Sequence, residues 1–508
     1  MNKKYKLGKD NRETIYTTAH YVGDIIGKTL GPGGRNYLLN SGITNDGKTI
    51  LHSIRFKDEC EDLVSLILMD VADNADKDGG DGTTTATVIA TRLIKDIIYK
   101  VSDLDVPIQS DSMSVMAITR KLQEEMIKII ELLNQEAKEI TTLEQLEDVA
   151  MTAMENKEIA KKVAEAVWSV GKDGFVTMED GYSGTVEIEN VPGIKYPIGV
   201  VAPFQYTNSK NEAIYADSPI LVANHFFTSL SELNPLLKEF NDTKRFSSFV
   251  IVAKGYEPPF IRSVYDLAQN ANFRILLLKT SMSDDEFEDI ASFVDTQVIN
   301  TSPRIGHKIA DVKMQSLGSN KKIIAGEKET VFIGGRGLEV MVMSSESMPV
   351  TRVASRVEQL KSLKTTKELE GRIARLSGGI AIIRIDAKTQ TEKYYIKLKV
   401  EDAKNSCIGA LKYGVVAGGG LTLSKIADVL GPEALTYNAL KEPFSVIQRN
   451  YGDTLDIGSG VLDSFNVVKS SVQNAISVVK ILITNEGIIA DEETTVIDEL
   501  NRKLMGNG

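Results

Sequence analysis

The sequence predicts a multidomain protein of α and α/β structure, in which both ends of the chain build one mainly helical domain and an α/β domain is inserted between them. Helical patterns dominate both ends of the 508 residues, whereas short β-rich runs alternate with helical ones over 190–350. Such alternation is typical of an α/β unit. Because the order of helical, mixed, α/β, mixed and helical stretches is nearly palindromic, we expect the middle domain to be inserted through paired connections.

The individual elements follow from local periodicity. Apolar residues recur at helical spacing over 58–75 and again over 85–101, which predicts two helices. The runs Phe249–Gly255 and Phe273–Ser281 are bounded and apolar, as buried strands are. A charged helix is expected over Val353–Leu376, and the serine and two glycines that follow are expected to end it.

Charge and cysteine content argue against several classes of function. The chain has 59 basic and 70 acidic residues, a net charge of −11, so we expect no binding to nucleic acid or to an anionic membrane surface, each of which needs a basic face. No apolar run approaches the length of a membrane span, and the first residues lack the apolar core of a signal peptide. Cys60 and Cys407 are too few for a disulfide framework and indicate a reducing compartment. We therefore expect a cytoplasmic protein.

Residues Gly42–Thr49 match the P-loop pattern G-x-x-x-x-G-K-[ST]. A P-loop needs a helix that opens at the lysine, so that backbone amides meet the phosphates. The residues from Thr49 to Ile54 are β-rich instead, with the next clear helical pattern near Asp58, and no convincing Walker B strand follows. We interpret the match as a chance pattern in a turn between two strands, and a P-loop NTPase stays the weaker alternative.

A second glycine-rich segment, Gly79–Thr87, favours phosphate binding more strongly. Its glycines let the backbone approach a polyanion, and three consecutive threonines stand at the expected start of a helix, where amides and the helix dipole attract phosphate. Asp81 supplies a carboxylate that can hold Mg²⁺ against phosphate oxygens. A plain helix cap needs only one threonine, so we prefer the functional interpretation. The glycines of 414–420 and the earlier Asp402 are weak signals by themselves.

Together, these segments resemble the group I chaperonins (the GroEL-type, sixty-kilodalton heat-shock chaperonin family), in order and over nearly the whole chain. The matching motifs are Thr29–Asn36, Ile43–Gly47, GDGTTTAT at 80–87, Gly171–Gly174 with Glu179–Gly181, Val400–Ala403 with Val416–Gly420, and Gly460–Asp463. The resemblance implies the chaperonin fold, with a mainly helical equatorial domain, a small intermediate domain and an inserted α/β apical domain that binds polypeptide. The implied boundaries are 1–133 and 413–508 for the equatorial domain, 134–192 and 378–412 for the intermediate domain, and 193–377 for the apical domain.

The resemblance further implies an ATPase that couples Mg²⁺-dependent ATP hydrolysis to protein folding. Subunits of the family form homo-oligomeric rings, with seven subunits expected in a single or double ring, and nonnative polypeptide clients bind in the ring cavity. The sequence leaves open whether a co-chaperonin is a further partner. A nucleotide-binding holdase or scaffold with lost or weak ATPase activity stays open as an alternative.

The functional residues of the family carry over position by position. Asp402 is implied to position or activate the attacking water, with Asp46 assisting, and Asp81 is implied to hold Mg²⁺. The other implied contacts to ATP are Thr29, Leu30, Gly31, Pro32, Asn45, Gly82, Thr83, Thr84, Thr85, Gly419 and Asp463. The residues that match the polypeptide-binding positions are Leu236, Leu237, Ile261 and Val264.

Three departures from the family pattern affect these expectations. The family usually has a lysine where Asn45 stands, but binding of K⁺ through the backbone carbonyl there would survive the change. Between Gly452 and Leu455 the chain lacks a segment that helps to hold adenine, so we expect different base contacts and looser nucleotide specificity. The C-terminal Gly-Gly-Met repeat of the family is reduced to Met505–Gly508, so the floor of the ring cavity is expected to differ.

Overall fold

The computed structural model divides the chain into two compact units. The first unit combines both ends of the chain with a short internal piece (Met1–Trp168, Asp180–Glu187 and Arg384–Gly508), and the second unit holds the rest (Ser169–Glu179 and Ile188–Ile383). The residues described are 3–40, 42–102, 114–154, 156–172, 174–270, 273–302, 306–343, 349–363, 367–452 and 460–491. A unit made from both ends, with another inserted into it, is the organisation that the sequence predicts. The point at which the chain lacks a family segment, between Gly452 and Leu455, falls within 453–459, and this stretch and the tail Met505–Gly508 lie outside the described residues.

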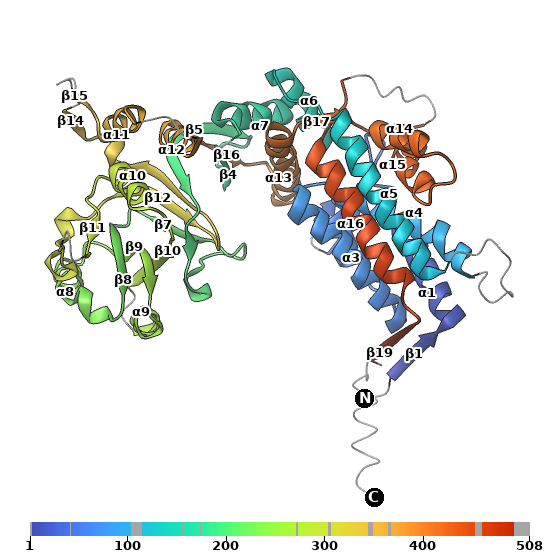
Figure 1. Cartoon of the computed structure of the whole chain (residues 1–508), viewed down its shortest axis with the longest axis horizontal. Coiled ribbons are helices and arrows are strands. Elements are labelled where there is room, and N and C mark those ends of the chain that lie inside the picture. Colours follow the sequence, from blue (N-terminus) through green and yellow to red (C-terminus); the bar gives the residue numbers. More distant parts are fainter. Residues whose placement is uncertain are drawn as a thin grey trace, which may run out of the picture. The chain divides into compact units, whose positions relative to one another are not determined.

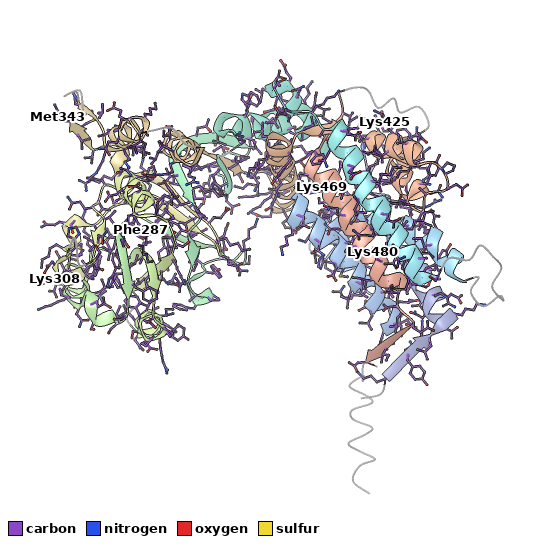
Figure 2. All side chains as sticks on the ribbon, viewed as in Figure 1. Phe287, Lys308, Met343, Lys425, Lys469 and Lys480 are labelled. Atoms are coloured by element: carbon purple, nitrogen blue, oxygen red, sulfur yellow. The ribbon has the colours of Figure 1, made fainter. Side chains whose placement is uncertain are left out.

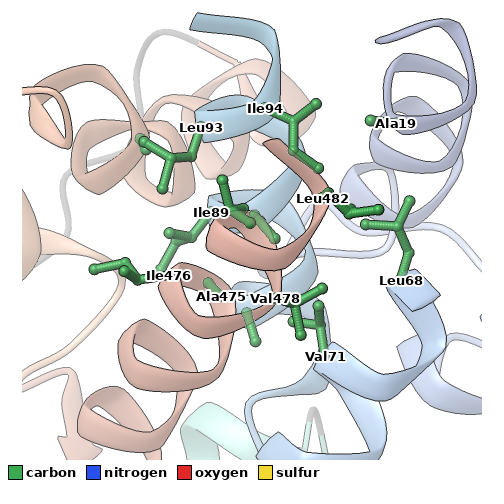
Figure 3. Packing of buried hydrophobic residues seen from close by; sticks show 14 of the residues in the cluster. Ala19, Leu68, Val71, Ile89, Leu93, Ile94, Ala475, Ile476, Val478 and Leu482 are labelled. Atoms are coloured by element: carbon green, nitrogen blue, oxygen red, sulfur yellow. The ribbon is translucent and has the colours of Figure 1, made fainter. Parts of the chain in front are cut away.

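The first unit is mainly helical (Figure 1). Its helices are α1 (Gly8–Gly27), α2 (Gly47–Ser53), α3 (Glu59–Gly79), α4 (Thr83–Ser102), α5 (Val115–Glu136), α6 (Leu143–Ala153), most of α7 (Lys157–Val170), α13 (Gln390–Tyr413), α14 (Leu421–Leu430), α15 (Tyr437–Tyr451) and α16 (Phe465–Ile483). Helix α16 packs against α3, α4 and α5, and α1 packs against α4. Figure 3 shows the apolar core between them, with Leu68 of α3, Ile89 of α4 and Ala475 of α16 in one cluster. The core therefore joins segments from both ends of the chain.

Local sequence signals explain where helix α3 begins and ends and where helix α4 begins. Asp58 caps α3, because its carboxylate accepts hydrogen bonds from the backbone N–H groups of Cys60 and Glu61. The helix stops at Gly80, whose φ of 77° is a left-handed conformation that glycine adopts without strain. Helix α4 begins at Thr83, only a few residues later. Both predicted helices exist, and each extends closer to the connecting turn than predicted.

Residues Gly47–Ser53 form helix α2, where the sequence predicted strand, so that prediction was wrong. Asp46 caps this helix by accepting hydrogen bonds from the backbone N–H and the hydroxyl of Thr49, the first at 2.8 Å. Ile50 and Leu51 then point into the core and are almost completely buried. The cap and the burial outweigh the weak helix propensity of the β-branched residues.

Three antiparallel two-stranded sheets belong to the first unit. They are β1 (Lys3–Leu7) with β19 (Gly487–Asp491), β2 (Tyr37–Leu39) with β3 (Gly42–Thr44), and β17 (Val415–Ala417) with β18 (Leu462–Ser464). Two of these sheets carry an exposed apolar pair across the strands, Tyr5 opposite Ile489 and Leu38 opposite Ile43. The third places Asp463 opposite Val416, so the two late segments predicted to border the nucleotide are paired.

The second unit is an α/β unit with two larger sheets. One has the strand order β4, β16, β5, β13, β12, β7, and the other has the order β11, β8, β9, β10, β6. The bounds are β4 (Phe175–Asp180), β5 (Glu187–Tyr196), β6 (Gly199–Val200), β7 (Ala213–Ala216), β8 (Ile220–Phe227), β9 (Ser248–Tyr256), β10 (Arg274–Lys279), β11 (Ile299–Asn300), β12 (Asn320–Ala325), β13 (Thr330–Gly335) and β16 (Gly379–Ile385), with β14 (Met341–Met343) and β15 (Pro349–Thr351) as a separate pair. Strands β9 and β10 run parallel side by side and are the two predicted buried strands.

The helices of the second unit are α8 (Asn234–Thr243), α9 (Pro258–Asn270), α10 (Asp284–Val294), α11 (Arg352–Lys361) and α12 (Lys367–Ser377), with short 3-10 turns at Pro203–Gln205, Leu230–Leu233, Ile309–Asp311, Met314–Ser316 and Arg336–Leu338. The charged stretch predicted as one helix is therefore two, α11 and α12. Asp289 of α10 is fully buried and holds both, with 2.8 Å to Arg356 and 2.7 Å to Arg372. Phe287, labelled in Figure 2, is buried on the same helix. None of the helices described combines the length and the apolarity that a membrane crossing requires.

Candidate functional site

One cavity in the first unit gathers side chains from both ends of the chain. Its volume is about 560 Å³, which is typical of small-molecule sites. Every residue that the sequence assigned to the nucleotide or to hydrolysis lines it. These residues are Thr29–Pro32, Asn45, Asp46 and Asp81–Thr85 from the first part of the chain, and Asp402, Gly419 and Asp463 from the last part. Motifs that are far apart in sequence thus share one space.

The loop that follows α1 forms one wall of the cavity. Gly31 has a φ of 80°, and a Cβ there would come within 2.9 Å of Ile447, so only glycine suits this turn. Asn450, at the end of α15, donates its side-chain amide to the carbonyls of Gly27 at 2.8 Å and Leu30 at 2.9 Å. The loop is therefore held in place from the last part of the chain.

The turn between α3 and α4 forms a second wall. Thr83, Thr84 and Thr85 open α4, where the backbone N–H groups have no partner inside the helix. Such a helix start attracts anions through its amides and its dipole. Just before it, Asp81 accepts a hydrogen bond from the hydroxyl of Ser406, with 2.8 Å between Oγ and Oδ2. A fixed carboxylate thus lies beside an anion-binding helix end, an arrangement that suits a metal–phosphate complex.

Helix α13 brings three side chains to the cavity, Lys399, Asp402 and Ser406. They are three and four residues apart, so they share one face of the helix. Burial raises the pKa of Asp402 well above its usual range, and the negative charges of Asp81 and Asp46 raise it further. Burial also raises the pKa of Asp81. The positive charge of Lys399 opposes both shifts.

Strands β17 and β18 and helix α6 complete the lining. The backbone N–H of Gly419 donates to the Oδ2 of Asp463 at 3.1 Å. Burial raises the pKa of Asp463 to about 6, with a further contribution from the charge of Asp81, although this N–H lowers it. From α6, Thr152 donates to the carbonyl of Leu462 at 2.9 Å, and Asp148 lines the cavity nearby. This wall supplies hydrogen-bond acceptors rather than positive charge.

The geometry argues against a P-loop at Gly42–Thr49. The first three of these residues form a hairpin strand, β3, instead of a loop around an anion. The Nζ of Lys48 lies 2.7 Å from Asp76 and 3.5 Å from Asp73, both on α3, and Lys48 is not among the residues that line the cavity. The interpretation as a chance match agrees with this geometry, although a helix rather than a strand follows.

Several lining or supporting residues were not found from the sequence. Lys399 and Ser406 had a usable signal, because their spacing from Asp402 places them on its helical face. Asp148 and Asn450 had none, since each reaches the site from a segment that carries no motif.

The predicted polypeptide-binding residues lie in the second unit and are mostly inside it. Leu236 and Val264 are buried in the core between α8, α9 and the five-stranded sheet, so in this structure they pack instead of facing a client. Leu237 and Ile261 are half-buried at the edge of the same cluster and stay candidates. The resemblance to the family gave these positions, but apolar residues on such helices suit core packing equally well.

Comparison with known proteins finds similarity to chaperonins in sequence over part of the chain and in fold over nearly all of it. Residues 22–227 match the model of the TCP-1/cpn60 chaperonin family. Two crystal forms of the chaperonin gp146 from the bacteriophage EL 2 (Pseudomonas aeruginosa), both in the presence of ATP-BeFx, are similar in fold. Form II has a TM-score of 0.63 at 16% identity and form I has 0.61 at 17% identity, and each comparison covers 96% of this chain and 99% of the phage chain.

The two comparisons cover different lengths of the chain. The family model spans the motifs around Thr29, Asp46 and Asp81, while the structural likeness extends the chaperonin fold over nearly the whole chain. Residues 22–227 are thus similar to the TCP-1/cpn60 chaperonin family, and nearly the whole chain is similar in fold to a phage chaperonin.

Proposed function

We propose that this protein is a chaperonin that binds nonnative polypeptides in a ring cavity and assists their folding through Mg²⁺-dependent ATP hydrolysis. The observation that supports the proposal most is the meeting of Asp46, Asp81 and Asp402 around one cavity, beside the open start of α4. Phosphoryl transfer requires positioning and charge neutralisation more than covalent chemistry from the protein. The similar phage chaperonin gp146 was crystallised in the presence of ATP-BeFx.

Each wall of the cavity suits one part of a bound ATP. The amides of Thr83–Thr85 and the loop Thr29–Pro32 would hold the phosphates. Asp81 would hold Mg²⁺, which neutralises phosphate charge when bound. Asp402 would orient the attacking water and accept its proton, and a raised pKa makes a carboxylate a better base. Asp46 would assist it.

The remaining lining residues suit the other groups of the nucleotide. Gly419 and Asp463 would border the ribose and the base, because the carboxylate of Asp463 is held by the N–H of Gly419 and can accept from hydroxyl groups. The carbonyl of Asn45, a buried residue beside Asp46, would bind K⁺. A nucleotide site of this kind would be specific mainly for the phosphates.

We propose the three domains with the boundaries predicted above, and a homo-oligomeric ring of seven subunits, single or double. The exposed pairs Tyr5–Ile489 and Leu38–Ile43 support self-assembly, because exposed apolar strand pairs are surfaces that another chain can cover. The free and buried thiols of the chain are compatible with a cytoplasmic location.

Negative-stain electron microscopy of the purified chain, with and without Mg-ATP, tests assembly and its coupling to nucleotide together. We expect rings with a central cavity whose shape changes with ATP. The matched control is Asp402→Ala, which should bind ATP without turnover and stay in the ATP-bound shape. Monomers or small oligomers under both conditions would contradict the ring. Intact rings that suppress aggregation but hydrolyse no ATP would favour the holdase alternative.

A further inference from the structure

The cavity has an unusual balance of charge. Its lining includes five carboxylates, which belong to Asp46, Asp81, Asp148, Asp402 and Asp463. Among the described lining residues, Lys399 alone is basic. A space lined in this way repels a polyanion unless positive charge is brought close to the phosphates. The position of that single ammonium group therefore matters for any nucleotide that binds.

Lys399 differs from its neighbours on α13 in having no counterion. Lys393 lies 3.5 Å from Asp180, and Lys397 lies 3.7 Å from the same carboxylate. The ammonium of Lys399, by contrast, makes no hydrogen bond and no ion pair with any residue within the described ranges. It is nevertheless close enough to Asp81 and Asp402 to affect the ionisation of both. A half-buried lysine in this position has its donors available for a ligand.

The placement on α13 indicates which part of the nucleotide it meets. Lys399 precedes Asp402 by three residues, so both side chains lie on one face of the helix, about one turn apart. Asp402 is the group proposed to act at the bond that is broken, and its negative charge would repel the terminal phosphate. A cation one turn away offsets this repulsion and neutralises charge on the transferred group.

We propose that the ammonium of Lys399 pairs with the terminal phosphate of the bound nucleotide, so that α13 contacts a triphosphate more strongly than a diphosphate. The inference rests on the proposed nucleotide function. It assigns to α13 both the carboxylate that acts on water and the cation that recognises the phosphate to be transferred. The same helix then distinguishes the nucleotide before and after hydrolysis.

The test measures binding by isothermal titration calorimetry on the full chain in Mg²⁺ buffer, with ADP and with the nonhydrolysable triphosphate AMP-PNP. For Lys399→Gln we expect AMP-PNP affinity to fall about 10- to 100-fold, the range of a charge-assisted hydrogen bond, while ADP affinity changes by less than about threefold. Lys399→Arg should restore most of the loss. The matched control is Lys412→Gln, an exposed lysine on the same helix outside the cavity, which should bind both nucleotides as the wild type does.

Two results would overturn the inference while leaving the nucleotide function in place. One is unchanged AMP-PNP affinity in Lys399→Gln. The other is an equal loss for ADP and AMP-PNP, which would indicate a general electrostatic or structural role. If Lys399→Gln does not fold, as judged by its melting curve, Lys399→Met is measured in its place because it keeps the apolar stem. Failure of the wild-type chain to bind either nucleotide would instead contradict the proposed function itself.

Discussion

Ser406 and Asp81 are joined by a hydrogen bond of 2.8 Å, although 325 positions separate them in the sequence. The adjacent Asn405 adds a second tie, because its amide donates to the carbonyl of Gly80 at 3.0 Å. Helix α13 is thus fastened to the turn that precedes α4. The carboxylate proposed to hold Mg²⁺ is oriented by the same helix that carries Asp402.

Removal of this hydrogen bond should weaken the metal-dependent part of nucleotide binding. In Ser406→Ala, Asp81 loses a donor that lowers its pKa, so its carboxylate becomes less acidic and less well oriented. We expect ADP affinity at saturating Mg²⁺ to fall by about 1–2 kcal/mol, measured by calorimetry over a range of Mg²⁺ concentrations. Ser445→Ala is the control, since Ser445 bonds only within α15 and does not line the cavity. An unchanged Mg²⁺ dependence would argue against Asp81 as the metal ligand.

Replacement of Asp402 should separate binding from turnover. In Asp402→Ala the proposed base is lost, and we expect the ATPase rate to fall at least about 100-fold. Nucleotide affinity should stay the same or increase, because a carboxylate that repels phosphate is removed. Steady-state phosphate release measures the ATPase rate, and calorimetry measures the nucleotide affinity. Glu401→Ala, its neighbour outside the cavity, should retain activity, and an undiminished rate in Asp402→Ala would remove the assigned role.

Lys48 provides the test of the P-loop alternative. Its ammonium pairs with Asp76 on α3 and does not line the cavity. We therefore expect Lys48→Ala to leave ATP binding and hydrolysis nearly unchanged and to cost about 0.2–1 kcal/mol of stability, as partly exposed ion pairs do. Asp76→Ala breaks the same pair and should have a similar effect on the melting temperature. Loss of ATP binding in Lys48→Ala but not in Asp76→Ala would instead support a P-loop at Gly42–Thr49.

The pKa of Asp463, raised to about 6, predicts a pH-dependent stability. A carboxyl group whose folded-state pKa exceeds its unfolded value of about 3.9 stabilises the fold while protonated, and this contribution is lost as the pH rises through 6. Asp463→Asn keeps an acceptor for the N–H of Gly419 and carries no charge. Without nucleotide, its stability relative to the wild type should increase by about 1–3 kcal/mol from pH 4.5 to pH 7.5. Melting curves measure this, and the exposed Asp266→Asn should show no such trend.

The local motifs were the predictable part of the site. The segment Gly79–Thr85 contains its glycines, its carboxylate and its hydroxyls within a few residues, and it lies at the start of α4 as the sequence indicates. Asp402 carried no such signal, because a single aspartate on a charged helix is usually solvated. It became a candidate only through the resemblance to a family, and the structure then brought it to the cavity.

The contacts between distant segments could not be predicted from periodicity. Ile50 is β-branched, yet its burial and the cap at Asp46 make its segment a helix. Leu236 and Val264 have an amphipathic pattern that suits either a core or a binding surface, and only the packing of α8 and α9 on a sheet decides that they are core. Asn450 bonds to Gly27 across most of the chain, a relationship that leaves no trace in either segment.

The composition of the cavity has a consequence for the newly synthesised chain. Residues Ser169–Ile383 leave the ribosome before α13, α15 and β18 exist, so the second unit can fold while the first is incomplete. At that stage Thr29 and Asp81 are present, but Asp402, Asp463 and the amide of Asn450 are not. Strand β1 also has to wait for β19 as its partner. The cavity is therefore incomplete in a nascent chain, and any activity that depends on it has to wait until the last part of the chain has been made and has packed against the first.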